Sequence, residues 1–179
     1  MKNFILIVNG PICAGKTAVI DVLMKEHRKI FRLSANKIKF LISDYTPDRD
    51  RQAVHDCLIL IAEKMLGVGM SLVMEGGSMA QGDLNERLLQ LGKKNNVAVL
   101  TVNIEAPLEV LLKRFNERVS VGTARGSKLS VRNESGFMER YNAYTHLKGT
   151  SQKTFDSSKS SPEQICREIM DQVQKTASE

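Results

Sequence analysis

The feature that most constrains this chain is a glycine-rich segment that follows directly on a run of apolar residues. The segment reads GPICAGKT over residues 10–17, and the apolar run reads FILIV over residues 4–8. The eight residues match the pattern G-x-x-x-x-G-K-[S/T] in full. A continuous apolar run is typical of a strand buried on both faces of a parallel sheet, and residues 16–28 have a helical pattern. The segment therefore stands between a strand and a helix, as this motif requires.

A loop of this kind, here called the P-loop, binds phosphate through its backbone. Glycine at positions 10 and 15 lets the chain wrap closely, so that successive N–H groups point at phosphate oxygens. The following helix adds the partial positive charge of its N-terminus. We expect the Lys16 ammonium to reach the β- and γ-phosphates and the Thr17 hydroxyl to ligate Mg²⁺. The sequence predicts a nucleotide site made of Gly10, Pro11, Ile12, Cys13, Ala14, Gly15, Lys16 and Thr17.

The rest of the chain alternates strand and helix patterns. After the first strand at 2–8, further strands are expected at 30–34, 70–75, 97–104 and 153–157. Helices are expected at 16–28, 36–43, 48–67, 83–94, 107–119 and 134–147, and a capping-box pattern at 161–164 opens a last helix. This alternation predicts one α/β domain over residues 1–179, with a five-stranded parallel sheet covered by helices on both faces.

Composition excludes several other classes of protein. The chain is 42% hydrophobic and 26% charged, which is an ordinary globular balance and argues against disorder. Its apolar runs are too short to cross a bilayer, and the first of them is too short for a signal peptide, so we expect a cytoplasmic protein with no membrane partner. Cys13, Cys57 and Cys166 are widely spaced and match no zinc pattern, so we expect reduced thiols.

The positive charge is concentrated in one stretch. The net charge is +6, and residues 113–132 contain six basic residues against one acid: Lys113, Arg114, Arg118, Arg125, Lys128 and Arg132 against Glu117. A focused cluster favours a clamp on phosphates, in a basic lid over about residues 119–135, whereas a solvated lysine-rich face is the alternative.

The other signatures of nucleotide-binding classes are missing. The one NK pair begins the segment NKIK at residue 36, which lacks the aspartate of the guanine-binding N-K-x-D pattern and stands too early in the chain. No LSGGQ segment occurs, and the chain is too short for an ATPase module with a helical lid domain. The class that remains is the small kinase, in which a mobile basic segment closes over the phosphates.

Segments along nearly the whole chain resemble small P-loop kinases. They are the P-loop, NKIKFLISDYTPDRDR (36–51), VMEGG (73–77), VNIEAPLEVLLKRFNER (102–118) and TFDSSKSSPEQICREI (154–169). More narrowly, the chain is similar to the branch of zeta toxins, chloramphenicol phosphotransferases and polynucleotide kinases, whose predicted members are often labelled AAA domain proteins. This resemblance implies the strand order 2-3-1-4-5, Mg-ATP as the phosphoryl donor and a lid after the fourth strand.

The resemblance also implies roles for particular residues. Arg114 and Arg118 lie four apart, so on a helix they share one face and can stabilise charge on the transferring phosphoryl group; helix-end arginines favoured by the helix dipole are the alternative. Asp156 matches the loop on the adenine side of the family's site, with an ordinary strand-to-helix connection as the alternative. Glu75 ends the third strand beside the strand that feeds the P-loop, where a carboxylate can hold Mg²⁺ or act as a base.

One position departs from the family pattern. Related kinases often place a general-base aspartate just after the second strand, and the matching residue here is Asn36, whose amide takes up no proton at neutral pH. Either the base lies elsewhere, or the chemistry needs little help from a base, or the acceptor is a phosphate. Asp44 is a candidate replacement for the base, with a helix-end carboxylate as the alternative. Lys37 and Lys39 are candidate contacts for an acidic acceptor, with a solvated helix face as the alternative.

The sequence therefore predicts an ATP-dependent phosphotransferase that uses Mg²⁺. We expect Lys16, Glu75, Arg114 and Arg118 to act in catalysis, and Asn36, Lys39 and Asp44 to meet the acceptor. A small-molecule hydroxyl is the first choice of acceptor, a nucleoside monophosphate the second and a nucleic-acid 5′-hydroxyl the third, because nine aromatic residues and no tryptophan make a poor stacking groove. A non-catalytic nucleotide-binding regulator is the alternative from another class. The oligomeric state stays open.

Overall fold

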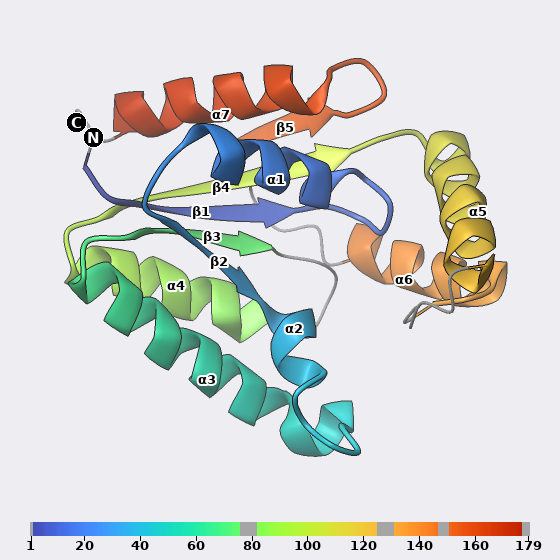
Figure 1. The fold of residues 1–179 in the computed structure, drawn as a ribbon, viewed down its shortest axis with the longest axis horizontal. Coiled ribbons are helices and arrows are strands. Elements are labelled where there is room, and N and C mark those ends of the chain that lie inside the picture. Colours follow the sequence, from blue (N-terminus) through green and yellow to red (C-terminus); the bar gives the residue numbers. More distant parts are fainter. Residues whose placement is uncertain (1, 76–81, 125–130, 147–150, 177–179) are drawn as a thin grey trace.

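The protein is built around a parallel sheet with the strand order β2-β3-β1-β4-β5. The computed structural model describes residues 2–75, 82–124, 131–146 and 151–176. Figure 1 shows α1 and α7 on one face of the sheet, α3 and α4 on the other, and α5 and α6 beyond the ends at which the strand arrows point. The predicted five-stranded sheet and its order are confirmed.

The elements follow the predicted alternation closely. The strands are β1 (Phe4–Asn9), β2 (Ile30–Ser34), β3 (Ser71–Glu75), β4 (Ala98–Glu105) and β5 (Lys153–Asp156). The helices are α1 (Lys16–Glu26), α2 (Ala35–Lys39), α3 (Pro47–Gly67), α4 (Gly82–Lys94), α5 (Leu108–Ala124), α6 (Glu134–His146) and α7 (Pro162–Thr176).

The strand register gathers the carboxyl ends of the strands along one edge of the sheet. Val8 of β1 and Ser34 of β2 both pair with Glu75 at the end of β3. Asn9 pairs with Asn103 of β4. Ligands of open α/β sheets bind outside the carboxyl ends of the strands, and the P-loop begins directly at this edge. The register therefore fixes where the functional site is to be sought.

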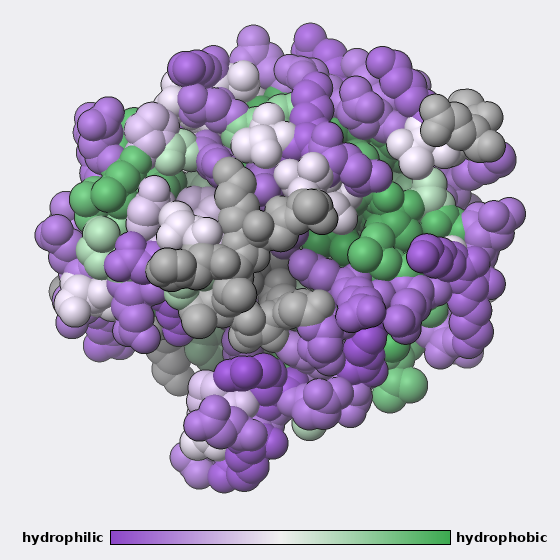
Figure 2. All heavy atoms as spheres, turned by 180° about the vertical axis from the view of Figure 1, so that it is seen from behind, coloured by the Kyte–Doolittle hydropathy of each residue, from purple (hydrophilic) through white to green (hydrophobic). Residues whose placement is uncertain are grey.

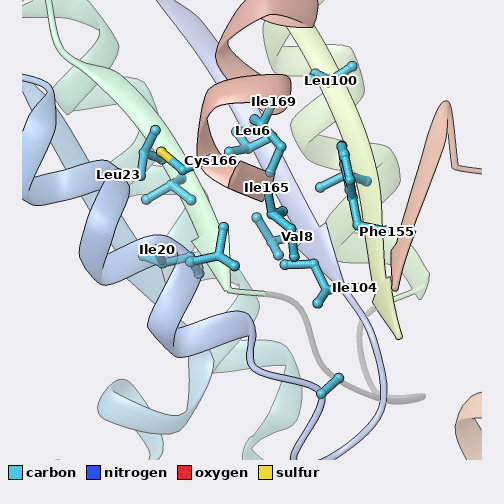
Figure 3. Packing of buried hydrophobic residues seen from close by; sticks show 14 of the residues in the cluster. Leu6, Val8, Ile20, Leu23, Leu100, Ile104, Phe155, Ile165, Cys166 and Ile169 are labelled. Carbon is cyan, nitrogen blue, oxygen red and sulfur yellow. The ribbon is translucent and has the colours of Figure 1, made fainter. Parts of the chain in front are cut away.

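Two buried clusters hold the helices on the sheet. Figure 3 shows the first cluster, in which Ile20 and Leu23 of α1 and Ile165 and Ile169 of α7 meet the strands. Val8 and Ile104 supply the sheet side of this cluster. The second cluster joins Ile5 and Ile7 to α3 and α4 on the opposite face. Alternate residues of β1 enter opposite clusters, which explains why the whole strand is apolar.

The last helix begins as the capping box predicts. The Ser161 backbone N–H donates to Gln164 Oε1 at 2.8 Å, and the Gln164 N–H donates to Ser161 Oγ at 3.3 Å. Pro162 occupies the first helical position. These reciprocal bonds satisfy backbone donors that the first turn of a helix leaves unpaired.

The predicted end of the helix after β4 is wrong. We expected it near Val119, where serine and glycine interrupt the apolar period, but α5 continues to Ala124. Gly122 is buried within it. A single glycine costs about 1 kcal/mol in a helix, which burial can offset. The first residues of the predicted lid segment are therefore helical, while Arg125 and Lys128 lie outside the described residues. The helix that we expected over residues 36–43 is also shorter than predicted, because α2 ends at Lys39.

The described surface is largely polar. Figure 2 shows hydrophilic residues over most of the face seen from behind, with hydrophobic residues in separate patches. Within the described residues, no helix combines the length and apolar character needed to cross a bilayer.

Replacing Gly92 and Gly67 by alanine should change the free energy of unfolding in opposite directions. A Cβ on Gly92 in α4 would come within 2.1 Å of Val99 Cγ2 and 3.1 Å of the Val97 carbonyl oxygen, whereas a Cβ on Gly67 at the end of α3 meets nothing within 4 Å. Gly92→Ala should lower the free energy of unfolding by about 1–3 kcal/mol through overpacking. Gly67→Ala should raise it by up to about 1 kcal/mol. Urea denaturation measures both, and effects of the same sign would contradict the packing described.

Candidate active site

The P-loop takes a backbone path that its sequence makes possible. Gly10 has φ 147°, and a Cβ there would lie 2.0 Å from the Ile104 carbonyl oxygen. Gly15 has φ 89° directly before α1, and Cys13 has φ 63°. Glycine adopts such angles without the Cβ penalty and permits close approach of two backbones. The loop is thereby folded against the end of β4, and α1 begins at Lys16.

The Lys16 side chain folds back across the loop. Its Nζ donates to the Gly10 carbonyl oxygen at 2.8 Å and to the Pro11 carbonyl oxygen at 2.7 Å. Burial lowers the pKa of Lys16 to about 8, although the nearby Glu75 charge acts in the opposite direction. An ammonium held by carbonyls at the start of a phosphate loop is ready to exchange these contacts for phosphate oxygens.

Glu75 joins the P-loop helix to the second strand. Thr17 Oγ1 donates to Glu75 Oε1 at 2.6 Å, and Arg32 Nη2 donates to Glu75 Oε2 at 2.5 Å. Burial opposes ionisation of this carboxyl, but the two hydrogen bonds and the Arg32 charge outweigh it and hold the pKa of Glu75 below its usual value. The residue therefore stays anionic, which suits a cation ligand better than a proton acceptor.

Arg32 is a site residue that the sequence interpretation did not assign. It lies in β2, where its Nη1 donates to Asp21 Oδ1 of α1 at 2.8 Å while Nη2 holds Glu75. A basic residue inside an otherwise apolar strand, IFRLS, was the available signal. A buried or half-buried arginine needs a carboxylate partner. The sequence contains many carboxylates and does not indicate which of them meets Arg32. Its Nε is buried without a hydrogen-bond partner among the described residues.

Arg114 and Arg118 of α5 both lie beside the P-loop residue Cys13. Arg114 Nη1 donates to Ser157 Oγ at 2.9 Å and contacts the Cys13 carbonyl oxygen at 3.5 Å, and Nη2 donates to the Ser157 carbonyl oxygen at 2.8 Å. Arg118 lies against the Cys13 thiol. Burial raises the pKa of Cys13, although the Arg118 charge and hydrogen bond, Lys16 and Arg114 act in the opposite direction. Cys13 is therefore a protonated packing residue at neutral pH.

Asp156 organises its own turn. Its Oδ1 accepts from the Ser158 backbone N–H at 2.9 Å and from Ser158 Oγ at 2.6 Å. These bonds hold the pKa of Asp156 below its usual value. Because Arg114 binds Ser157 within the same turn, the loop after β5 is tied to the P-loop. The adenine-side role of Asp156 stays a prediction.

The candidate acceptor residues lie on and after α2. Asn36 is exposed near the start of this helix. The Asp44 side chain is 87% exposed and pairs with Arg49 at 3.6 Å, so the structure joins it to α3. Lys39 is half-buried, with Nζ 5.6 Å from the centre of the Tyr45 ring. Among the described contacts, none links Asp44 to Glu75 or to the P-loop.

The carboxyl edge of β4 carries two further polar groups that sequence reasoning missed. Asn103 is 2% exposed, and its Nδ2 has no hydrogen-bond partner among the described residues. Glu105 Oε1 accepts from the Tyr144 hydroxyl of α6 at 2.9 Å, which fixes α6 beside this edge. Burial first, then the hydrogen bond and charge of Glu105, raises the pKa of Tyr144. The contact with Tyr144 becomes visible only where α6 packs beside the end of β4.

The donor set beside the P-loop fits a magnesium ion. Mg²⁺ prefers oxygen ligands and commonly binds through one or two carboxylates, water and substrate phosphates. Thr17 Oγ1 and Glu75 Oε1 are such donors and lie 2.6 Å apart. Arg32 donates a hydrogen bond to Oε2 of Glu75 only. Oε1 accepts the hydrogen bond of the Thr17 hydroxyl, and a cation can take the place of that hydrogen bond.

A model of the family described as "AAA domain" matches residues 5–134. The chain belongs to this family. The matched range begins in β1 and ends at the first residue of α6, so it includes the P-loop, Arg32, Glu75 and both arginines of α5. No curated protein matches the chain.

Solved structures share the fold over almost the entire chain. A presumed kinase from Chloroflexus aurantiacus is 22% identical with a TM-score of 0.69, covering 98% of this chain and 99% of its own. The Deinococcus radiodurans tunicamycin resistance protein is 19% identical with a TM-score of 0.62, covering 96% of each chain. Mycobacterium tuberculosis APS kinase, solved with AMPPNP and APS, is 11% identical with a TM-score of 0.61, covering 97% and 98%. The predicted likeness to small P-loop kinases is confirmed at the level of the fold.

The low pKa of Lys16 should make nucleotide binding depend on pH. With a pKa of about 8 in the free protein, Lys16 loses its proton as the pH rises through 8, and phosphate binding must then take up a proton. ATP affinity should therefore fall between pH 7.5 and 9.5, by up to about tenfold per pH unit. Calorimetry in buffers of different ionisation enthalpy measures the affinity and the proton uptake together.

Lys16→Met is the control for this titration. Its weaker binding should lack the proton uptake, whereas Lys37→Gln, at an exposed position of α2, should retain it. Equal ATP affinity of the unmodified protein at pH 7.5 and pH 9.5 would contradict the role of Lys16 in this titration.

Proposed function

We propose that this chain is a phosphotransferase that moves the γ-phosphoryl group of Mg-ATP to a hydroxyl of a small molecule. The observation that carries the proposal is the contact of Thr17 with Glu75 at 2.6 Å, because it joins a phosphate-binding helix to an anionic carboxylate at the end of the adjacent strand. Such a pair of oxygen donors can hold the Mg²⁺ of Mg-ATP beside the phosphates. The family and the fold agree with this reading.

Some of these residues bind Mg-ATP, and others stabilise the charge that develops on the transferring phosphoryl group. The P-loop amides and Lys16 hold the phosphates, and Thr17 and Glu75 hold Mg²⁺, which supplies charge neutralisation at the phosphoryl oxygens when it is bound. Arg118 stabilises charge on the transferring group from its place beside Cys13. Arg114 is committed to Ser157 and Cys13, so its contribution is to position the P-loop and Arg118.

Positioning takes the place of strong base catalysis in this proposal. The depressed pKa of Glu75 makes it a weak base, and Asn36 orients the acceptor hydroxyl by hydrogen bonding rather than by taking its proton. Phosphoryl transfer passes through a loose transition state in which the attacking hydroxyl needs little activation. Asp44 faces solvent and Arg49 and is not assigned a role in proton transfer.

A nucleoside monophosphate and a nucleic-acid 5′-hydroxyl are the other acceptors to be tested, and a regulator that binds ATP without transfer is the competing function. Cytoplasmic action belongs to the proposal, because ATP is the donor and Cys13, Cys57 and Cys166 are all unpaired.

Transfer of label from γ-labelled ATP tests the proposed reaction directly. The protein and its Lys16→Ala variant are compared with Mg²⁺ and a panel of sugars, hydroxylated antibiotics, nucleoside monophosphates and a 5′-hydroxyl oligonucleotide. Label on a small molecule that disappears with Lys16→Ala is the expected result. ATP binding without label on any acceptor would favour the regulator.

Glu75→Gln should separate turnover from binding. The substitution keeps the shape but removes the negative charge beside Thr17, so kcat should fall by about 100-fold or more while the Kd of ATP without Mg²⁺ changes by less than about threefold. Glu109→Gln, at an exposed position of α5, is the matched control and should leave both unchanged. Equal losses of turnover and affinity would show that Glu75 has no specific part in the chemistry.

A further inference from the structure

We propose that Glu26, His27 and Cys166 form a zinc site that is separate from the nucleotide site. Glu26 is the last residue of α1 and His27 follows it directly, whereas Cys166 lies in α7. The P-loop is at the opposite end of α1, which has 11 residues and is therefore about 16 Å long. A metal ion bound by all three side chains would join the helix that follows the P-loop to the last helix of the chain.

The three ligand atoms converge. A carboxylate oxygen of Glu26, an imidazole nitrogen of His27 and the sulfur of Cys166 all lie within 4.8 Å of one another. Zinc binds sulfur at about 2.3 Å and nitrogen or oxygen at about 2.0–2.2 Å, so the ligand atoms around a tetrahedral ion stand roughly 3.5 Å apart. Glu26 is exposed, and rotation of its long side chain can close the remaining distance. Among the residues that the structure describes, no other three such ligands converge in this way.

Packing of α1 against α7 holds two of the ligands in place. Both helices cover the same face of the sheet (Figure 1), and Figure 3 shows Cys166 of α7 in the buried cluster together with Leu23 of α1. The His27 backbone N–H donates to the Leu23 carbonyl oxygen at 3.0 Å, which fixes the place of His27 at the end of the helix. The sulfur and the imidazole therefore come from ordered positions, and Glu26 supplies the adjustable ligand.

The mixture of donor atoms favours zinc over magnesium. Thiolate and imidazole are ligands of zinc and similar transition metals, whereas Mg²⁺ prefers oxygen. The pair formed by Thr17 and Glu75 offers only oxygen atoms. The two sites should therefore bind different metals, with water in the fourth coordination position of the zinc ion.

The charges around Cys166 also favour a cation. Burial first, and then the negative charges of Glu26 and Glu163, raise the pKa of the Cys166 thiol to about 11. The thiol is therefore protonated in the free protein, and it loses its proton to solvent when its sulfur binds the metal. One thiolate and the carboxylate of Glu26 then match the two positive charges of the ion, so no net charge is buried at the site.

Zinc binding is measured by calorimetry on the full chain, under reducing conditions and with excess Mg²⁺ to occupy the oxygen site. We expect one tight zinc ion per chain. Loss of a partner that only orients a metal ligand weakens binding by about 10- to 100-fold, so loss of a ligand itself should weaken it by about 100-fold or more in His27→Gln and in Cys166→Ala.

Two control variants remove the same chemical groups elsewhere. Cys57→Ser removes a thiol from α3, and Asp171→Asn removes a carboxylate from an exposed position of α7. Both should bind zinc as the unmodified protein does. Absence of tight zinc binding by the unmodified protein would overturn the inference, and so would equal affinity in His27→Gln.

Cobalt identifies the sulfur ligand. Co²⁺ can take the place of Zn²⁺, and a thiolate bound to it gives a charge-transfer absorption that nitrogen and oxygen ligands do not give. The absorption should appear with the unmodified protein and with Cys57→Ser, and should be absent from Cys166→Ala. An absorption that persists in Cys166→Ala would place the metal at another cysteine and overturn the site.

Thermal unfolding tests whether the ion stabilises the packing of the two helices. Zinc at 100 times its Kd should raise the Tm of the unmodified protein by about 5–10 °C, and should leave the Tm of His27→Gln nearly unchanged. Circular dichroism verifies that each variant is folded. If Cys166→Ala does not fold, His27→Gln decides the outcome, because its side chain is only half-buried.

This inference goes beyond the proposed function and does not depend on it. None of these measurements uses ATP or an acceptor, so failure of phosphoryl transfer would leave the zinc site standing. Failure of zinc binding would likewise leave the assignment of Thr17 and Glu75 unchanged.

Discussion

The hydrogen bond between Thr17 and Glu75 is the contact on which the site depends. It exists because Val8 pairs with Glu75 across the sheet, so that β3 ends beside the strand that enters the P-loop. Arg32 completes the arrangement from β2, and its second contact with Asp21 ties the same carboxylate to α1. Three segments that are distant in sequence thereby hold one anionic group at the place where a nucleotide's phosphates and a cation would meet.

Charge is distributed differently on the two sides of this carboxylate. On the P-loop side, three basic groups have defined partners: Lys16 binds carbonyls, Arg114 binds Ser157 and Arg32 binds Glu75. At the end of α2, burial lowers the pKa of Lys39, and the charges of Arg140 and Arg51 lower it further. Asp44 pairs with Arg49 at 3.6 Å, and its role as a replacement for the missing aspartate stays a prediction.

Local patterns predicted much of this architecture, and the failures share a cause. The apolar run of β1, the P-loop and the capping box at Ser161 are signals contained within a few residues, and the structure contains all three elements. The predicted end of α5 was wrong because burial of Gly122 offsets the free-energy cost of a glycine inside a helix. Arg32 and Asn103 were missed because their significance arises from partners on other strands and helices.

The sequence by itself determined the class of the fold, the phosphate loop and the helix face shared by Arg114 and Arg118, because hydrophobic period and glycine placement act over short distances. Only the tertiary structure decided which carboxylate meets Thr17 and which arginine holds it in its charged form. Pairing between strands and the packing of helices against them set these contacts, and no spacing along the chain encodes the distance between Arg32 and Glu75.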